Sequence, residues 1–392
     1  MRSTGRPALD AIVAYAGERS PYYRELLGRH DRFHDLPPLT KPLVRANFER
    51  ILVPGMPPER IERKRTSGST GEPTEFVADR GIGREAQQAR DWLLELGGIP
   101  TDTNVVFVVL GLPGPLPAHW TGLSMREMRR DNLRERLAAL DRLDGYIIYG
   151  AASSLEWIAA EVERAPEALP TTLPLAVVTS ADTLTSLGRE RIGRVFGCPV
   201  HSWYGSIETD PSLAGTLPGD GERYVVNDER AYVEVTDEHG RPCAPGERGQ
   251  ILVTDLHNRC FPLLRYALGD LAVASDRRFR GFATLERIEG RSAAMVELES
   301  GVQVTESMVS RAVLRAPAAT ESIEGFQCAQ TGPNAVEVRV VWRGAPDVNG
   351  AAQLEASCLH AWGASTDVSI RAVERLDVLP SGKRWVLRGL AG

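Results

Sequence analysis

Lysine is scarce in this sequence of 392 residues, because it occurs only at positions 41, 64 and 383, although lysine and arginine together number 46. A high-GC genome produces the same preference for arginine, so the scarcity alone assigns no role. Lysine is a compact, mobile point charge, and Lys41, Lys64 and Lys383 are therefore candidates for specific use. The formal net charge of −6 excludes a general nucleic-acid binder, which would carry a basic excess.

Cysteine pairs and long apolar runs are missing as well. The five cysteines are widely spaced, odd in number and form no Cys-x-x-Cys pair, so neither a disulfide framework nor a zinc ribbon is expected. The start, Met1 to Pro7, lacks the apolar run of a signal peptide, and no apolar stretch reaches the length of about 18 residues that a membrane helix needs. We therefore expect a soluble, cytoplasmic protein with no membrane partner.

Two common nucleotide-binding patterns are also missing from the glycine-rich stretch 66–74. No Gly-Lys-Ser/Thr follows it, and its glycines lack the G-x-G-x-x-G spacing. The stretch still combines Gly68 and Gly71 with several hydroxyl side chains, so that backbone N–H and side-chain O–H groups can surround an anion. A flexible surface loop has the same composition, and the stretch alone leaves both readings open.

Alternating apolar strands and amphipathic helices dominate the first half of the chain. The expected strands are 75–78, 104–110, 145–149, 175–179 and 199–203. The expected helices are 8–28 with a break at Ser20-Pro21, one beginning near Thr40, 81–97, 124–140, one capped by Ser153 or Ser154, and 187–196. Strands that alternate with helices pair in parallel, so we predict an α/β fold with a mainly parallel sheet.

The pattern changes twice in the second half. Strands joined by turns at 224–235, 249–254, 263–274 and 283–288 predict a β-rich, mainly antiparallel region. From about residue 301, two helices and two strands predict a small α+β domain. We therefore expect an N-terminal domain of residues 1–290, with its β-rich part at about 222–290, and a small C-terminal domain of residues 291–392.

Two segments at expected strand ends carry candidate site residues. In Trp203 to Glu208, an aromatic ring can stack on a base, a hydroxyl can contact a phosphate, and a carboxylate can hold Mg²⁺. In Leu268-Gly269-Asp270, a carboxylate follows a glycine, an arrangement suited to ribose hydroxyls. Each segment is also compatible with an ordinary turn, so neither assigns a function alone.

The glycine-rich stretch 66–74 and the two segments at 203–208 and 268–270 together resemble the core motifs of the adenylate-forming (acyl- and aryl-activating) superfamily. They occur in the order of that superfamily, and the resemblance extends over nearly the whole chain. The phenylacetate-coenzyme A ligase-like branch is the closest match. Further matching segments are 36–41, 180–182, 245–254, 290–292, 301–304 and 380–383.

The resemblance implies ATP and Mg²⁺ as cofactors, with coenzyme A as a further one. It implies a grip on the β- and γ-phosphates by Thr66, Ser67, Gly68, Ser69, Thr70 and Gly71. It places the other nucleotide contacts at Ser180, Ala181, Asp182, Tyr204 (stacked on adenine), Gly205, Ser206 (α-phosphate), Glu208 (Mg²⁺), Asp270 (ribose) and Arg291. It also implies that the C-terminal domain is mobile and brings in Lys383 to bridge the substrate carboxylate and the α-phosphate.

The sequence departs from the superfamily pattern at three places. Glu72 stands where the phosphate loop usually has lysine, Ala267-Leu268 replace an arginine and a threonine before Gly269, and Ala293-Ala294 follow the hinge motif where an acidic residue is usual. Arg277 to Phe282 contain no cysteine, so we expect no counterpart of the zinc site found in some relatives.

The acid pocket is expected at the loops beyond the parallel strands. Its expected walls are His119, Trp120, Tyr149, Gly150, Ala151, His201 and Trp203. The small residues at 150–152 leave space for a flat ring, which favours an aryl or arylalkanoic acid. His119 is either a contact to the acid or a loop histidine with no role.

The resulting hypothesis is ATP-dependent activation of a small, aromatic carboxylic acid as acyl-AMP, with release of pyrophosphate. Transfer to a thiol of coenzyme A or of a carrier protein would follow. Two alternatives stay open, namely transfer to an amine or other nitrogen nucleophile, and a non-catalytic member that serves in binding or as a scaffold. The sequence does not determine the acid, the acceptor or the assembly, for which a homodimer is one option.

Overall fold

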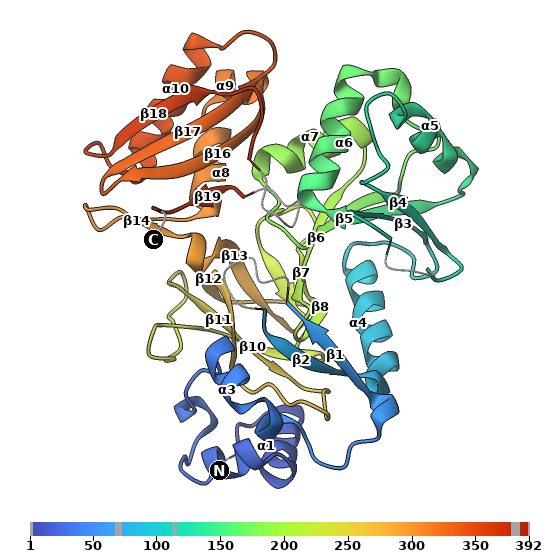
Figure 1. Cartoon of the computed structure of the whole chain (residues 1–392), viewed down its shortest axis with the longest axis vertical. Helices are drawn as coiled ribbons and strands as arrows, with labels where there is room; N and C mark the ends of the chain where they lie inside the picture. Colours follow the sequence, from blue (N-terminus) through green and yellow to red (C-terminus); the bar gives the residue numbers. More distant parts are fainter. Residues whose placement is uncertain (1–2, 67–72, 113–115, 378–384, 391–392) are drawn as a thin grey trace. The chain divides into compact units, whose positions relative to one another are not determined.

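The computed structural model describes residues 3–66, 73–112, 116–377 and 385–390 (Figure 1). The chain divides into two compact units, each built from two separate stretches. Unit 1 consists of residues 1–101 and 203–288, and unit 2 of residues 102–202 and 289–392. The chain passes from unit 1 to unit 2 for the last time after residue 288, which is close to the expected domain boundary after residue 290. The division into domains 1–290 and 291–392, and the mobility of the second, stay predictions.

Unit 1 begins with helices that start at prolines. Pro7, Pro21 and Pro42 each occupy a first helical turn, where the missing N–H group costs nothing. The expected break at Ser20-Pro21 is confirmed. The helices of unit 1 are α1 (Pro7–Arg19), α2 (Pro21–Leu27), α3 (Lys41–Ile51) and α4 (Gly83–Leu96), with short 3₁₀ turns η1 (Phe33–Asp35), η2 (Pro58–Arg60) and η3 (Arg80–Ile82).

The strands of unit 1 form a hairpin and an antiparallel sheet, which confirms the β-rich region. The hairpin is β1 (Ile61–Arg65) with β2 (Glu75–Asp79). The sheet has the order β10-β11-β12-β13-β9-β8-β7. Its strands are β7 (Val200–Ser206), β8 (Asp210–Thr216), β9 (Tyr224–Val226), β10 (Ala231–Thr236), β11 (Arg248–Asp255), β12 (Tyr266–Phe279) and β13 (Phe282–Arg291).

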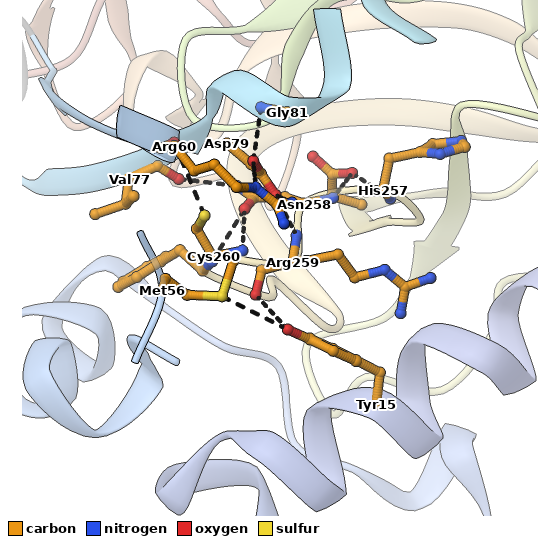
Figure 2. A network of polar contacts seen from close by, with 12 residues as sticks. Tyr15, Met56, Arg60, Val77, Asp79, Gly81, His257, Asn258, Arg259 and Cys260 are labelled. Atoms are coloured by element: carbon orange, nitrogen blue, oxygen red, sulfur yellow. Dashed lines mark hydrogen bonds and ion pairs between the residues drawn. The ribbon is translucent and has the colours of Figure 1, made fainter. Parts of the chain in front are cut away.

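A buried carboxylate, Asp79, fixes the end of the hairpin (Figure 2). Arg60 donates to it from Nη2 and Nε at 2.5 and 3.0 Å, and the backbone N–H groups of Gly81 and Arg259 donate at 2.8 and 3.2 Å. Burial raises the pKa of Asp79, but Arg60 and these N–H groups outweigh it, so the pKa lies below its usual value. Nearby, Asn258 Nδ2 donates to the Val77 carbonyl at 2.8 Å. The hairpin that carries the glycine-rich loop is therefore tied to the chain after β11.

Unit 2 contains the parallel sheet and a smaller mixed sheet. The parallel strands are ordered β4-β3-β5-β6-β7, and the mixed sheet β18-β17-β16-β19. These strands are β3 (Asn104–Val109), β4 (Trp120–Ser124), β5 (Tyr146–Ala151), β6 (Ala176–Ser180), β16 (Ile323–Gly332), β17 (Ala335–Trp342), β18 (Asp367–Ala372) and β19 (Leu387–Arg388), with the short pair β14 (Val296–Glu297) and β15 (Gln303–Val304). The predicted α/β class with a mainly parallel sheet is confirmed.

The helices of unit 2 cover both sheets. They are α5 (Leu133–Ala138), α6 (Ala152–Arg164), α7 (Ser186–Phe196), α8 (Glu306–Leu314), α9 (Pro317–Ser322) and α10 (Val348–Trp362), with the 3₁₀ turns η4 (Ala139–Arg142), η5 (Pro166–Ala168) and η6 (Ser292–Ala294). Val106, Ile148 and Val177 of the parallel strands pack with α5, α6 and α7 in one core. Among the described residues, no helix is long and apolar enough to cross a membrane.

Two local expectations in unit 2 are wrong. The helix expected at 124–140 is limited to α5 at 133–138, followed by the 3₁₀ turn η4. Ser124 is instead the last residue of the edge strand β4, which pairs in parallel with β3. The cap expected at Ser153 or Ser154 is also absent, since α6 begins at Ala152 and Ala151 makes no side-chain cap. Ser153 Oγ donates instead to Asp182 at 2.5 Å.

Candidate active site

Tyr204 and Asp270, which lie 66 residues apart in the sequence, are brought together in unit 1. The Tyr204 hydroxyl donates to Asp270 Oδ2 at 2.8 Å. Tyr204 stands near the end of β7 and Asp270 in β12. Gly269 precedes Asp270 and has a backbone φ of +84°, a conformation that residues other than glycine rarely adopt. The residues expected at adenine and at the ribose are thus direct neighbours.

The turn after β7 is connected through hydrogen bonds to a buried ion pair between Arg230 and Asp255. Ser206 Oγ lies 3.0 Å from Thr209 Oγ1 and accepts from the Thr209 N–H at 3.3 Å. The Thr209 carbonyl accepts from Arg230 at 3.1 Å, and Arg230 pairs with Asp255 at 2.5 and 3.0 Å. These contacts fix the direction in which Ser206 and Glu208 leave the strand.

Glu208 is a buried carboxylate with a cation and a hydroxyl beside it. Its residue is 8% exposed. The Tyr266 hydroxyl donates to Oε1 at 3.4 Å, and Lys41 Nζ lies 3.5 Å from the same oxygen. A carboxylate oxygen is the ligand type that Mg²⁺ prefers, so the donor fits the expected metal. The motif alone did not reveal Lys41 and Tyr266 as its neighbours.

The ends of the glycine-rich loop are joined to each other. The Thr66 N–H donates to the Thr74 carbonyl, and the Thr74 N–H donates to Thr66 Oγ1, each at 3.0 Å. Arg45 of α3 donates to Thr74 Oγ1 at 2.9 Å. Of the residues expected to grip the β- and γ-phosphates, only Thr66 is described. Ser67, Gly68, Ser69, Thr70 and Gly71 lie outside the described residues, as do Glu72 and Lys383.

In unit 2, four residues of neighbouring parallel strands form a row across one face of the sheet. Phe107 pairs with Tyr149, Tyr149 with Val178, and Val178 with His201. Residues in register on parallel strands point to the same face, and this face is opposite to the one that packs on α5, α6 and α7. Phe107 and Tyr149 are stacked, with ring centroids 5.6 Å apart at an interplanar angle of 18°.

Trp120 and His119 border this row. The Trp120 ring makes edge contacts with Phe107 and Tyr149 at centroid distances of 5.4 and 6.2 Å. Its indole N–H donates to Nε2 of the exposed His119 at 3.0 Å. Phe107 was not among the expected wall residues. Its side of the strand depends on the sheet register, which an apolar run does not reveal.

The other four expected wall residues are Gly150, Ala151, His201 and Trp203, and each has its own local setting. A Cβ on Gly150 would lie 2.6 Å from the Val108 carbonyl oxygen, so close packing of β3 and β5 explains this glycine. Burial lowers the pKa of His201, assisted by Arg189, which keeps its ring neutral at neutral pH. Ala151 continues β5 beside Ser180. Trp203 belongs to unit 1, where it is buried and contacts Gly215.

The segment after β6 has an unusual backbone. Ser180 Oγ donates to the Tyr149 hydroxyl at 3.1 Å. Ala181 has φ +70°, a conformation that costs a residue other than glycine roughly 1–3 kcal/mol and often marks functional sites. Asp182 accepts from the Ser153 N–H and hydroxyl, so its carboxylate fixes the start of α6. Arg291 ends β13 with an exposed side chain.

Comparisons with known proteins find relatives that match most of this chain. Protein CapK of Staphylococcus aureus is 22% identical, covering 94% of this chain and 85% of its own. Phenylacetate-coenzyme A ligase of Escherichia coli strain K12 is 28% identical, covering 77% and 74% respectively. No protein-family model matches the sequence.

Solved structures give the same fold. A 2-hydroxyisobutyryl-CoA ligase in complex with R3-HIB-AMP matches 98% of this chain and 88% of its own, with a TM-score of 0.80 and 16% identity. The O-succinylbenzoate coenzyme A synthetase of Bacillus subtilis, in complex with ATP and a magnesium ion, matches 82% and 68%, with a TM-score of 0.53 and 16% identity. The resemblance to the adenylate-forming superfamily, and to its phenylacetate-coenzyme A ligase-like branch, is thus confirmed by relatives in sequence and by the shared fold. The named ligases among these relatives agree with the expected class, an AMP-forming ligase.

The structure describes two of the three places where the sequence departs from the superfamily pattern, namely Ala267-Leu268 and Ala293-Ala294. The Ala267 N–H donates to the Leu39 carbonyl at 2.9 Å, and the Leu268 side chain is 2% exposed within the core of unit 1. This strand segment therefore aligns the chain before α3 and anchors Asp270 through packing. Ala293 and Ala294 lie in the short turn η6, directly after β13.

Proposed function

We propose that this protein activates a small carboxylic acid with ATP and Mg²⁺, releases pyrophosphate, and transfers the acyl group from acyl-AMP to coenzyme A. The observation that carries the proposal is the unit 1 cluster in which Tyr204 contacts Asp270 and a buried Glu208 follows on the same turn. The similarity of the chain to adenylate-forming ligases supports it. The bound ATP and magnesium of the Bacillus subtilis synthetase support the choice of cofactors.

The chemistry needs positioned charges rather than a protein nucleophile. An oxygen of the substrate carboxylate attacks the α-phosphorus of ATP, the bond to the bridging oxygen breaks, and pyrophosphate leaves with the electron pair. The protein lowers the barrier by aligning the two anions and stabilising the charge that develops. In this proposal Tyr204 stacks on adenine, Asp270 binds the ribose hydroxyls, and Ser206 contacts the α-phosphate. Glu208 would hold Mg²⁺, and the ion would supply positive charge beside the phosphates.

An aromatic acid is the substrate class that the row on the parallel sheet favours. Phe107 and Tyr149 offer stacked rings, and Trp120 adds an edge. Aromatic rings prefer offset-stacked or edge-to-face neighbours, so a flat acyl group would find suitable partners here. The name of the Escherichia coli relative, a phenylacetate ligase, is consistent with this choice.

Pyrophosphate release tests the first half-reaction. With a panel of benzoic, aminobenzoic, phenylacetic, 2-hydroxyisobutyric and short fatty acids, we expect acid-dependent release that is about tenfold or more faster for the best aromatic acid than for the aliphatic acids. If no acid in a broad panel increases release by the wild-type protein, the non-catalytic alternative becomes the better description.

The acceptor is decided by product analysis after the best acid is known. We expect a coenzyme A thioester by mass spectrometry when ATP, acid and coenzyme A are supplied together. A thioester formed only on a carrier protein would replace coenzyme A as the acceptor. An amide formed from an added amine would support the nitrogen-transfer alternative.

Replacing Tyr149 with alanine tests the aromatic row. We expect kcat/KM for the best aromatic acid to fall about 10- to 100-fold, since one ring contact contributes on this scale, while a short aliphatic acid is affected by less than about threefold. The Tyr149→Phe variant keeps the ring and removes the hydroxyl that accepts from Ser180, and it is the matched control. Equal loss for aromatic and aliphatic acids would contradict a specific role of the ring.

A further inference from the structure

Lys41 is placed next to the carboxylate of Glu208. Its Nζ lies 3.5 Å from Glu208 Oε1, and the two side chains are 26% and 6% exposed. Lys41 is the first residue of α3. The helix macrodipole disfavours a cation at this end, so the residue is not explained by helix stability. Its charge is directed at the site.

Backbone hydrogen bonds of Leu39 to the two residues that flank Tyr266 fix the position of Lys41. The Leu39 N–H donates to the Arg265 carbonyl and the Ala267 N–H donates to the Leu39 carbonyl, each at 2.9 Å. The chain that leads into α3 therefore runs beside the start of β12. The Tyr266 hydroxyl of the same segment reaches Glu208, so Lys41 and Tyr266 converge on one oxygen from adjacent pieces of backbone.

A second cation lies one helical turn further along α3. Arg45 donates to Thr74 Oγ1 at 2.9 Å, where the glycine-rich loop rejoins the described chain. Residues four apart share one face of a helix. The face of α3 that carries Lys41 and Arg45 therefore supplies positive charge to Glu208 and to the end of the loop.

The proposed reaction requires such charge. ATP brings a polyanion, and the loop itself contributes Glu72 where lysine is usual in the superfamily. We propose that Lys41 contacts the pyrophosphate part of ATP and replaces the positive charge missing from the loop. This inference rests on the proposed function. Lys41 Nζ pairs with Glu208, and if Glu208 held Mg²⁺, the three N–H donors of Lys41 would be available to phosphate oxygens.

Binding of ATP and of AMP distinguishes this role from a structural one. We measure both affinities by isothermal titration calorimetry, with Mg²⁺, for the wild type and for Lys41→Met. A charge-assisted contact to the pyrophosphate part predicts that Lys41→Met weakens ATP binding about tenfold or more and changes AMP binding by less than about twofold. The Lys41→Arg variant keeps a positive charge and is expected to recover most of the ATP affinity.

Arg50→Met is the matched control on the same helix. Arg50 pairs with Glu25 at 2.5 Å on a solvent-exposed surface, and its removal is expected to leave both affinities unchanged. Unchanged ATP affinity of Lys41→Met in a protein whose wild type binds ATP would overturn this proposal alone. Equal weakening of ATP and AMP would overturn it in favour of a structural role. A wild type that binds neither nucleotide would refute the proposed function, and this inference with it.

Discussion

Replacing Lys383 with alanine is expected to lower acid-dependent pyrophosphate release by about 100- to 1,000-fold, the range for removing one donor that stabilises transition-state charge. In the proposed mechanism Lys383 bridges the substrate carboxylate and the α-phosphate while the new bond forms. Its contribution is therefore made in the transition state, and ATP affinity should stay within about twofold of the wild type. Single-turnover pyrophosphate release and calorimetric ATP binding measure the two quantities.

Lys64→Ala is the control for this prediction, because it removes the remaining lysine, which is half-buried on the hairpin strand β1. We expect it to change neither quantity by more than about twofold. A Lys383→Ala protein that forms acyl-AMP at the wild-type rate would remove Lys383 from the mechanism.

Variants at Lys41 and at Lys383 are expected to lose different properties, which separate assays measure. Loss of Lys41 weakens ATP binding, whereas loss of Lys383 slows chemistry with ATP binding preserved. A chain with three lysines would then use two of them at separate stages of one reaction. This contrast is informative because a general loss of structure would affect both assays in both variants.

The motifs of the candidate site could be predicted from sequence because each is local. A glycine before Asp270 and a hydroxyl two residues before Glu208 are visible in the printed chain. The approach of Tyr204 to Asp270 followed only from the family resemblance. The parallel strands could be predicted for a similar reason, since buried strands read as continuous apolar runs.

The neighbours of the motifs could not be predicted, because they depend on pairing between distant segments. Lys41 reaches Glu208 only because the chain before α3 aligns with β12. Phe107 joins Tyr149 and His201 only through the register of four strands, and a shift of one residue would turn it to the other face. β4 lies mostly in a stretch where a loop is expected, because a short strand at a sheet edge has little periodicity of its own.

Arg265→Met is expected to destabilise unit 1 by about 3–5 kcal/mol, the range for removing one partner of a buried ion pair. Arg265 is 1% exposed. Its guanidinium donates to both oxygens of Glu234 at 3.1 Å and to the carbonyls of His34, Leu36 and Gly240. Within the described part of the chain, the variant leaves the buried Glu234 carboxylate with the partly exposed His34 ring, 3.1 Å away, as its remaining charged partner. Urea-induced unfolding measures the loss.

Two further variants isolate the cause. Arg241→Met removes a guanidinium that is exposed and pairs with Asp237 at the surface, and it is expected to change stability little. Arg265→Met combined with Glu234→Gln removes the stranded charge, so we expect it to recover part of the lost free energy. If Arg265→Met unfolds at the same urea concentration as Arg241→Met, the buried pair does not stabilise unit 1.

The same variant links stability to the site through residues 33–41. Arg265 holds the His34 and Leu36 carbonyls through its side chain and Leu39 through its own carbonyl, and this stretch leads directly to Lys41. We therefore expect faster amide hydrogen exchange in a peptide that covers 33–41 of Arg265→Met, measured by mass spectrometry under conditions where the protein is folded. If Lys41 contacts the pyrophosphate part of ATP, the folded variant should also bind ATP more weakly while its AMP affinity is retained. Faster exchange with unchanged ATP affinity would mean that Lys41 reaches its position without the support of Arg265.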